Sequence, residues 1–295
     1  MRSKLFFGIA TMLLLASCEE AFETEFGNEV NGSTEIFSAT TETEPSTRTS
    51  LSGYTNGDGC YSLYWDSGDA ISICDGTNTA VYTTDDSYTS SADFVRSEGK
   101  ISNTAAQYEA FYPSSITTTN MILPANQNYV DGNIENFPMR AVSTNKNLAF
   151  KNLCGIIRFC LKSEENGQLK VSSISISADK GMSGAFTVGE DNAAVVTGTD
   201  GVVLTCAEAE QLYATSTTDF NIIVPQGEYN PLKVKICDAE GNEVNLVSEG
   251  AISVKRSEIT RITLTLAKST FETSLETIPI TDSDVDFTER QSNIQ

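Results

Sequence analysis

Short runs of alternating apolar and polar residues, separated by turn residues, constrain this chain more than any other feature. They recur about every 8–12 residues, as in Val171–Ser177 and Ile259–Leu266, a spacing typical of β-sandwiches. The pattern covers roughly 220 residues, whereas one seven-stranded sandwich uses about 100. It therefore predicts an all-β protein with two tandem β-sandwich domains.

The longest apolar segment beyond the N-terminus, Leu148–Leu161, predicts a central strand, and the polar turn Glu164–Gly167 follows it. We therefore expect the N-terminal sandwich at 49–165 and the C-terminal sandwich at 166–267. The inward residues of the central strand would be Ile157, Phe159 and Leu161. Helical patterning is weak, and only Ala207–Leu212 favours a helix.

The N-terminus has the layout of a lipoprotein signal peptide, expected at 1–17. Arg2 and Lys4 precede an apolar run of 11 residues, Leu5–Leu15, which is too short to span a bilayer. Leu15–Cys18 then has the pattern of a lipobox, which predicts lipidation of Cys18 and anchoring to the outer membrane. The alternative is an ordinary signal peptide with an incidental cysteine.

Residues 18–48 are polar and acidic, which predicts a tether or a removable N-terminal segment. The acidic run Glu19–Glu23 resembles the surface-export signal of Bacteroidetes lipoproteins and indicates the cell surface. Arg48 is the first basic residue after Lys4. Its isolation in a polar stretch makes it a candidate for proteolytic processing.

Charge and composition exclude several classes of function. The chain holds 40 acidic and 19 basic residues, a formal charge of −21, which argues against binding nucleic acid through phosphate contacts. It contains no histidine, which removes Ser-His-Asp and Cys-His catalysis and His-ligated zinc. We expect no enzyme and no cofactor, although an acidic pair of the glycosidase type stays open.

Two groups of aspartates invite a metal-site interpretation. Asp66, Asp69 and Asp75 match no calcium loop, so surface turn carboxylates are the better reading. Asp282, Asp284 and Asp286 imitate the start of such a loop, but Phe287 stands where a glycine is needed. We expect no metal site at either place.

Six cysteines remain besides Cys18, an even number that would permit three disulfides in an exported protein. Most lie inside apolar runs, where a cysteine behaves as a small buried hydrophobe. We therefore favour free, buried thiols. The six are Cys60, Cys74, Cys154, Cys160, Cys206 and Cys237.

The acidic tail, 268–295, contains apolar residues at alternate positions among acids. It is either a disordered tail or a lone strand without a partner in its own domain. In the second case Thr277–Phe287 is a candidate donor strand for another molecule. Its apolar residues are Ile278, Ile280, Val285 and Phe287.

A series of motifs follows the lipobox along nearly the whole chain. In order they are Thr47-Arg48-Thr49, Trp65–Ile71 (WDSGDAI), Phe111-Tyr112-Pro113, Leu123–Gln127 (LPANQ), Phe150–Leu153 (FKNL), Val224–Gly227 (VPQG) and Arg256–Thr260 (RSEIT). Together they resemble the fimbrillin-like family of Bacteroidales, the subunits and anchors of lipoprotein-derived pili.

The resemblance implies two transthyretin-like β-sandwiches and export as a lipoprotein. It also implies that an arginine-specific or trypsin-like protease removes the lipid-bearing segment with the first strand, here after Arg48. The groove so opened would be filled by a strand from a neighbouring subunit, often from its C-terminal tail, by β-strand addition.

Two functions from different classes therefore remain open. The first is a structural pilus subunit, shaft or tip, whose partners are other pilin subunits. The second is an adhesin or glycan-binding lipoprotein that keeps its lipid and does not polymerise. Host or bacterial surface ligands are expected partners in either case.

Overall fold

Alternation of buried and exposed side chains produces strands throughout the computed structural model, which describes residues 35–42, 63–131, 133–272 and 277–287. In Ile259–Leu266, for example, Ile262, Leu264 and Leu266 are buried, and the residues between them face outward. Over the described ranges the protein is nearly all β with several sheets, which confirms the predicted fold class.

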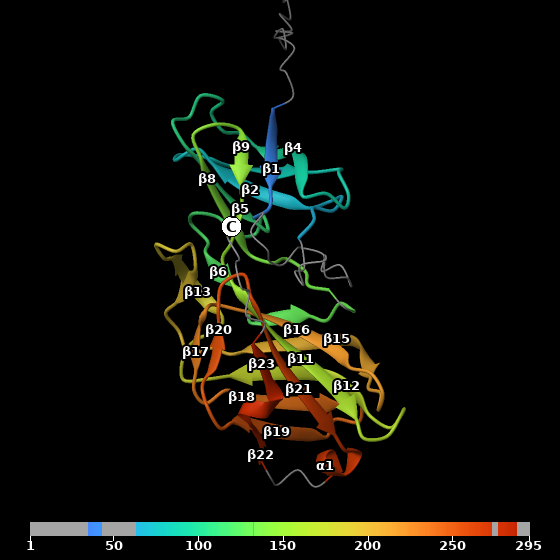
Figure 1. Ribbon diagram of the computed structural model, residues 1–295. Helices are drawn as coiled ribbons and strands as arrows, with labels where there is room; N and C mark the ends of the chain where they lie inside the picture. Colours follow the sequence, from blue (N-terminus) through green and yellow to red (C-terminus); the bar gives the residue numbers. More distant parts are fainter. Residues whose placement is uncertain (1–34, 43–62, 132, 273–276, 288–295) are drawn as a thin grey trace, which may run out of the picture. The chain divides into compact units, whose positions relative to one another are not determined.

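The first sheet contains eight strands (Figure 1). In sheet order they are β10 (Lys151–Asn152), β8 (Met139–Ser143), β5 (Tyr108–Tyr112), β2 (Ala70–Cys74), β3 (Thr79–Thr83), β4 (Ser91–Gly99), β1 (Ile36–Thr40) and β9 (Asn147–Ala149). Only Phe150 separates β9 from β10, at opposite ends of this order, so the sheet curls back on itself.

An aromatic cluster fills the inside of the first sheet. Trp65 is fully buried and meets three rings edge-on, with centroid distances of 5.1 Å to Phe94, 5.4 Å to Tyr112 and 5.4 Å to Phe150. Such edge-to-face pairs stabilise a core beyond the area they bury. The Trp65 backbone forms an isolated bridge with Thr89.

Two further sheets enclose a second hydrophobic cluster (Figure 1). The larger contains β22 (Thr277–Ile280), β19 (Glu243–Ser248), β18 (Lys233–Asp238), β12 (Lys170–Ser177), β15 (Val202–Gln211) and β7 (Asn126–Asn128). The smaller contains β16 (Thr218–Val224), β11 (Gly155–Ser163), β21 (Ile259–Leu266) and β23 (Val285–Phe287).

The predicted boundary at 165/166 places β11 in the wrong sandwich. β11 is a central strand, as expected, but it pairs with β16 and β21, and its odd-numbered apolar residues belong to the second cluster. Because Gly155–Leu161 is buried on both faces, its apolar run could not reveal which sheet it joins.

Short strands from the first half of the chain also join sheets of the second half. β7, from the first half, pairs with β15. A three-stranded sheet joins β6 (Ile122–Leu123) to β13 (Gly184–Val188) and β14 (Ala194–Val196), and β17 (Gly227–Tyr229) pairs with β20 (Ile252–Val254). The chain therefore does not divide into two sandwiches at a single point.

Local helical preference is overridden in one place. The helix expected at Ala207–Leu212 is wrong, because Ala207–Gln211 is the end of β15, where Glu210 and Gln211 pair with β12. The regular helices of the described residues are α1 (Lys268–Glu272) and the 3₁₀ turn η1 (Asp282–Asp284). No described helix is long and apolar enough to span a membrane.

Candidate functional site

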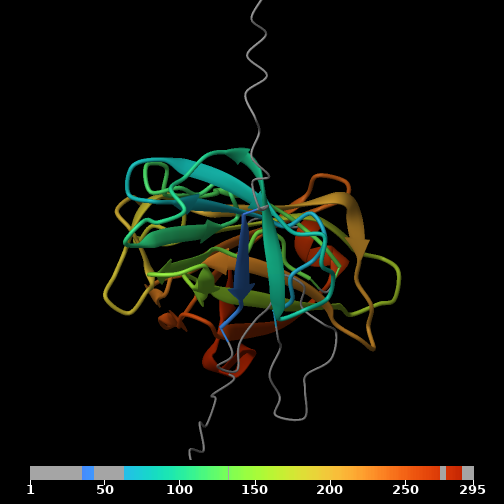
Figure 2. The same ribbon diagram turned by 90° about the horizontal axis from the view of Figure 1, so that it is seen from above.

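β1 lies inside the first sheet, between β4 and β9. It runs antiparallel to β4 and parallel to β9, and β1 (blue) lies beside β4 (teal) in Figure 1 and Figure 2. On the β9 side, Ser38 N donates to Lys146 O at 3.0 Å and Phe150 N donates to Thr40 O at 2.8 Å. The tether predicted for 18–48 is thus wrong at Ile36–Thr40, which forms a strand.

The inward side chains of β1 fill the aromatic core. Phe37 and Ala39 are fully buried, and the Phe37 ring meets Tyr82 at 5.1 Å and Tyr108 at 5.0 Å between centroids. Trp65 Nε1 donates to Ala39 O at 3.1 Å. We call the place that β1 occupies the β1 seat. It has a deep aromatic pocket that holds Phe37, a shallow pocket that holds Ala39, and the buried indole N–H of Trp65 as a hydrogen-bond donor.

A carboxylate holds the N-terminal end of β1. Glu35 is almost fully buried, and its oxygens lie 3.7 Å from Arg96 Nη1 and 3.4 Å from Lys146 Nζ. With its amide in the favourable orientation, Asn103 also donates to this carboxylate. Since a carboxylate is buried at low cost only with charged or hydrogen-bonding partners, this end of the seat is built for an acid.

A second carboxylate holds the C-terminal end. Glu42 Oε2 lies 2.7 Å from Arg256 Nη1 and accepts from Asn152 N at 3.1 Å and from Ser257 Oγ at 3.2 Å. Ser257 has a φ of 65°, a conformation that few residues other than glycine adopt. The local backbone thus brings this hydroxyl onto Glu42.

Sequence reasoning missed Glu35, Phe37 and Glu42. The alternation of Ile36–Thr40 was present, but it is short and lies in an acidic stretch that reads as a tether. Composition averaged over 18–48 hid a five-residue strand. Only the spacing of the two acids, seven positions apart, gave a further signal.

The tail residues expected to form a donor strand contact their own chain. β22 pairs in parallel with β19, and β23 pairs antiparallel with β21, so both expectations for the tail, disorder and a lone strand, are wrong over 277–287. Ile280 is buried in the second cluster, and Ile278 and Val285 pack against it. The turn η1 separates the two strands, so Asp282, Asp284 and Asp286 do not alternate along one strand.

The predicted lipidation site Cys18 and processing site Arg48 lie outside the described residues, as does Cys60. The five described cysteines are free, as expected. Cys154, Cys160 and Cys206 are buried, whereas Cys74 and Cys237 are half-buried. Burial raises the pKa of Cys206 to about 11, so its thiol is protonated at neutral pH.

The first aspartate group serves turns, as expected. Asp75 accepts backbone N–H bonds from Thr77, Asn78 and Ser102, which lower its pKa to about 2. Asp69 accepts from Asp66 N and from the Tyr112 hydroxyl, at 2.9 and 2.8 Å, while burial raises its pKa. No cluster of three metal-ligating side chains occurs among the described residues.

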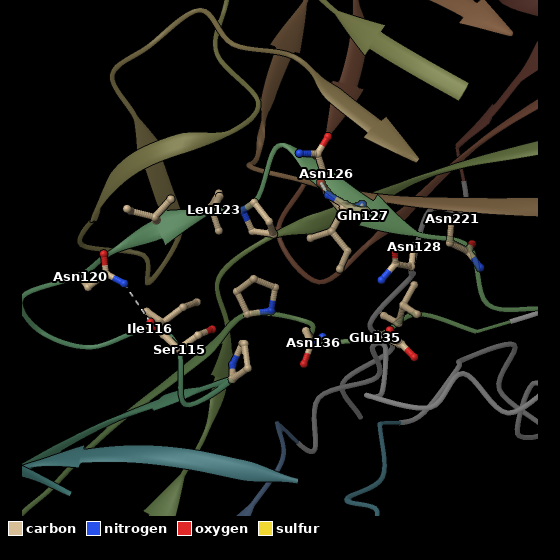
Figure 3. A pocket seen from close by; sticks show the side chains of 16 residues that line it. Ser115, Ile116, Asn120, Leu123, Asn126, Gln127, Asn128, Glu135, Asn136 and Asn221 are labelled. Atoms are coloured by element: carbon tan, nitrogen blue, oxygen red, sulfur yellow. Dashed lines mark hydrogen bonds between the residues drawn. The ribbon is translucent and has the colours of Figure 1, made fainter. Parts of the chain in front are cut away.

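A pocket of about 420 Å³ lies where β6 and β7 approach the loop around Asn136 (Figure 3). Its lining combines buried apolar side chains, among them Ile116, Leu123 and Ile223, with side-chain amides. Gln127 is fixed by two bonds to the Ile223 backbone, at 2.8 and 2.9 Å. The lining amides are Asn120, Asn126, Gln127, Asn128, Asn136 and Asn221.

The pocket favours neutral ligands over charged ones. Its lining includes no lysine or arginine and a single acid, Glu135. Amides both donate and accept hydrogen bonds, so the arrangement suits a neutral polar molecule with an apolar face. Trp65 cannot act as an exposed platform for a sugar ring, because it is fully buried.

The fold is shared with solved structures. A "putative cell adhesion protein" from Bacteroides ovatus matches with a TM-score of 0.52 and 13% identity, over 79% of this chain and 92% of that chain. Another from Bacteroides uniformis gives 0.45 and 17%, over 81% and 95%. The tip fimbrial protein Mfa3 from Porphyromonas gingivalis, with C-terminal truncation, gives 0.34 and 7%, over 67% and 88%. No protein-family model and no curated protein sequence matches the chain.

Two of these neighbours are named as putative cell adhesion proteins and one as a tip fimbrial protein. The similarity to the Bacteroides ovatus protein concerns the fold. It agrees with the fold class that the resemblance implied.

Proposed function

We propose that this protein is a surface pilus subunit, exported as a lipoprotein through Cys18, matured by cleavage after Arg48 and assembled by β-strand exchange. The position of β1 carries the proposal. Ile36–Thr40 lies in the interior of the first sheet, yet it precedes Arg48 in the chain. A cut after Arg48 would leave β1 bound to the sheet only by noncovalent contacts.

Loss of β1 would create a strong binding site for another strand. β4 and β9 would each present unpaired backbone N–H and C=O groups along one edge, and such edges pair readily with an added strand. The pockets of Phe37 and Ala39 would open at the same time. A strand from a neighbouring subunit would supply both the backbone hydrogen bonds and the side chains.

The C-terminal segment is the proposed donor. β23 occupies the edge of its sheet next to β21, so it can leave without breaking a sheet interior. Fold neighbours whose names describe cell adhesion and a tip fimbrial protein support a pilus-related adhesive role. Other pilin subunits are the partners, the lipid anchor places the precursor in the outer membrane, and the mature pilus lies at the cell surface.

Limited trypsin treatment of the chain from residue 19 to 295 tests the proposal. Intact mass should show a single early cut after Arg48, and size exclusion should then show growth into high-mass species that survive SDS. The matched control is Arg48→Gln, which should be neither cut there nor assembled. Cleavage at Arg48 without assembly at any concentration would overturn the proposal.

The amide-lined pocket supports a second candidate, a lipid-retaining adhesin or glycan-binding lipoprotein that does not polymerise. Its lining suits a neutral saccharide, which offers hydroxyls to amides and C–H faces to apolar side chains. The test is an NMR titration of the Arg48→Gln protein with neutral oligosaccharides. Saturable shifts that Asn126→Ala abolishes would favour this function, and absence of shifts across the panel would exclude it.

A further inference from the structure

The β1 seat has a positive charge at each end, and this inference rests on the strand exchange proposed above. Arg96 and Lys146 face Glu35 at one end, and Arg256 faces Glu42 at the other. When β1 leaves, both carboxylates leave with it and these cations remain. The incoming strand must therefore bring two acids seven positions apart, with apolar residues between them.

The backbone of the seat accepts a strand in either direction. β1 is antiparallel to β4 and parallel to β9. A strand rotated by half a turn about the normal to the sheet runs in the opposite direction, and each side chain stays on the same face of the sheet. Its ladder with β4 then becomes parallel, and its ladder with β9 becomes antiparallel. In the reversed strand, the backbone carbonyl of the residue at the Thr40 position lies where Ala39 O lies in β1. Trp65 Nε1 therefore keeps a hydrogen-bond acceptor. Side chains, not the backbone, must decide the direction.

The acidic tail matches β1 when it is read backwards. β1 begins with Glu35-Ile36-Phe37, and the tail contains Phe287-Thr288-Glu289, the one Phe-x-Glu spacing among the 14 phenylalanines of the chain. Asp282 lies seven positions before Glu289, the spacing of Glu35 and Glu42. In the reversed register Glu289 takes the place of Glu35, Phe287 of Phe37, Val285 of Ala39, Ser283 of Thr41 and Asp282 of Glu42.

The best register in the original direction fits less well. It would place Glu276 at Glu35 and Ile278 at Phe37, and this puts Pro279 at Ser38. Ser38 N donates to Lys146 O at 3.0 Å, a bond that proline cannot make. That register would also extract Ile280 from the core of its own subunit, where it is 1% exposed.

We infer that residues 282–289 of a second copy fill the β1 seat in the direction opposite to β1, fixed by Glu289 at the Arg96–Lys146 end and by Asp282 at Arg256. β22 stays in its own subunit and holds the donor segment to it. The segment that leaves its place is then η1 with β23, and Val285 of this segment packs at the margin of the second cluster.

Two residues of the reversed strand fit the β1 seat poorly, and each provides a test of the register. Asp286 would lie at the Ser38 position, opposite Asp93, where two like charges repel. Val285 exceeds Ala39 by two carbons. The register therefore predicts that Asp93→Asn in the accepting copy raises the yield of complex, and that Val285→Ala in the donor is tolerated.

Crosslinking between two differently prepared copies tests the direction. The acceptor is cut after Arg48, and the donor is left uncut, so that its own seat stays filled. In β4, Val95 lies opposite Ile36 and Ser91 opposite Thr40, and both are exposed. Each acceptor variant, Val95→Cys or Ser91→Cys, is mixed with a donor that carries one added cysteine. A short bismaleimide then crosslinks neighbouring thiols. Both parents without added cysteines control for the native thiols.

The reversed register predicts crosslinks of Val95→Cys with Thr288→Cys and of Ser91→Cys with Asp284→Cys, at least about tenfold above the opposite pairs. Crosslinks of Val95→Cys with Thr277→Cys and of Ser91→Cys with Thr281→Cys would overturn the direction while leaving strand exchange intact. Heterodimers on size exclusion with neither crosslink pattern would overturn the register as well. Absence of any heterodimer would instead count against the proposed function itself.

Discussion

Glu42 and Arg256, 214 positions apart in the chain, form a two-point ion pair, with Arg256 Nη1 2.7 Å from Glu42 Oε2 and Nη2 3.2 Å from Oε1. Arg256 Nη1 also donates to Asn152 O at 3.0 Å. Glu42, two positions beyond the end of β1, is thereby tied to the turn that precedes β21. In the proposed strand exchange, release of β1 would break this link, so the pair would control how long a subunit cut after Arg48 keeps its first strand.

Glu42→Gln should lower the free energy of unfolding of the uncut protein by about 1.5–3 kcal/mol, because charged hydrogen bonds are lost in a largely buried place. It should also speed the departure of β1 after cleavage. Urea denaturation and mass spectrometry of the released fragment measure the two effects. Glu258→Gln is the control, since its 3.7 Å pair with the exposed Lys255 contributes at most about 1 kcal/mol. Equal effects of the two variants would refute the role of Glu42.

Phe37→Ala should destabilise the uncut protein by about 3–5 kcal/mol, the usual cost of emptying a buried aromatic site. After cleavage it should accelerate polymer growth, because β1 leaves sooner. The finished polymer should be as resistant to SDS as the parent polymer, since β1 is no longer part of it. Ile36→Ala, on the exposed face of β1, should change stability by no more than about 0.5 kcal/mol. A polymer weakened by Phe37→Ala would show that β1 is retained.

Ile280→Ala should lower the stability of the monomer by about 2–5 kcal/mol, because Ile280 is buried in the second cluster. Thr277→Ala, at an exposed position of the same strand, should be nearly neutral. Thermal unfolding of uncut monomers measures both. An unchanged melting temperature for Ile280→Ala would mean that β22 is not held in its own subunit.

Asp75 should make stability depend on acid pH. Three backbone N–H bonds lower its pKa from 3.8 to about 2, so the folded state favours the carboxylate. The resulting stabilisation is complete above the unfolded pKa and is lost as pH falls from 3.8 to about 2. Asp75→Asn should therefore be less stable than the parent at pH 6, with the difference shrinking towards pH 2. Asp85→Asn, which removes an exposed charge in the same half, is the control for the change in net charge.

The alternating strands could be predicted from sequence because one face of each is buried. β12 and β21 show this, with apolar residues at every second position along most of their length. β11 was predicted as a central strand but not in its correct sheet, since burial on both faces removes the alternation that would identify its neighbours. Ala207–Gln211 was predicted as a helix, and this was wrong because it continues β15, where the pairing of Glu210 and Gln211 with β12 outweighs a local helical preference.

The first strand of the candidate site could not be predicted from the sequence. Arg48 stood out by its isolation and the apolar residues of the tail by their alternation, but their roles in processing and strand donation stay predictions. β1 could not be recognised, because its two inward residues, Phe37 and Ala39, are too few to give a strand pattern within an acidic stretch. Its partner Arg256 is distant in the chain, and no local rule connects it to Glu42.

The position of Trp65 has a practical consequence for testing the proposed strand exchange. It is the only tryptophan in the chain, it is fully buried, and its Nε1 donates to a carbonyl of β1. Intrinsic fluorescence excited at the indole therefore reports on a single place in the molecule. Water entering the vacated seat should shift the emission to longer wavelength, and arrival of a new strand should shift it back. Vacancy and refilling can thus be timed in one cuvette without an attached dye.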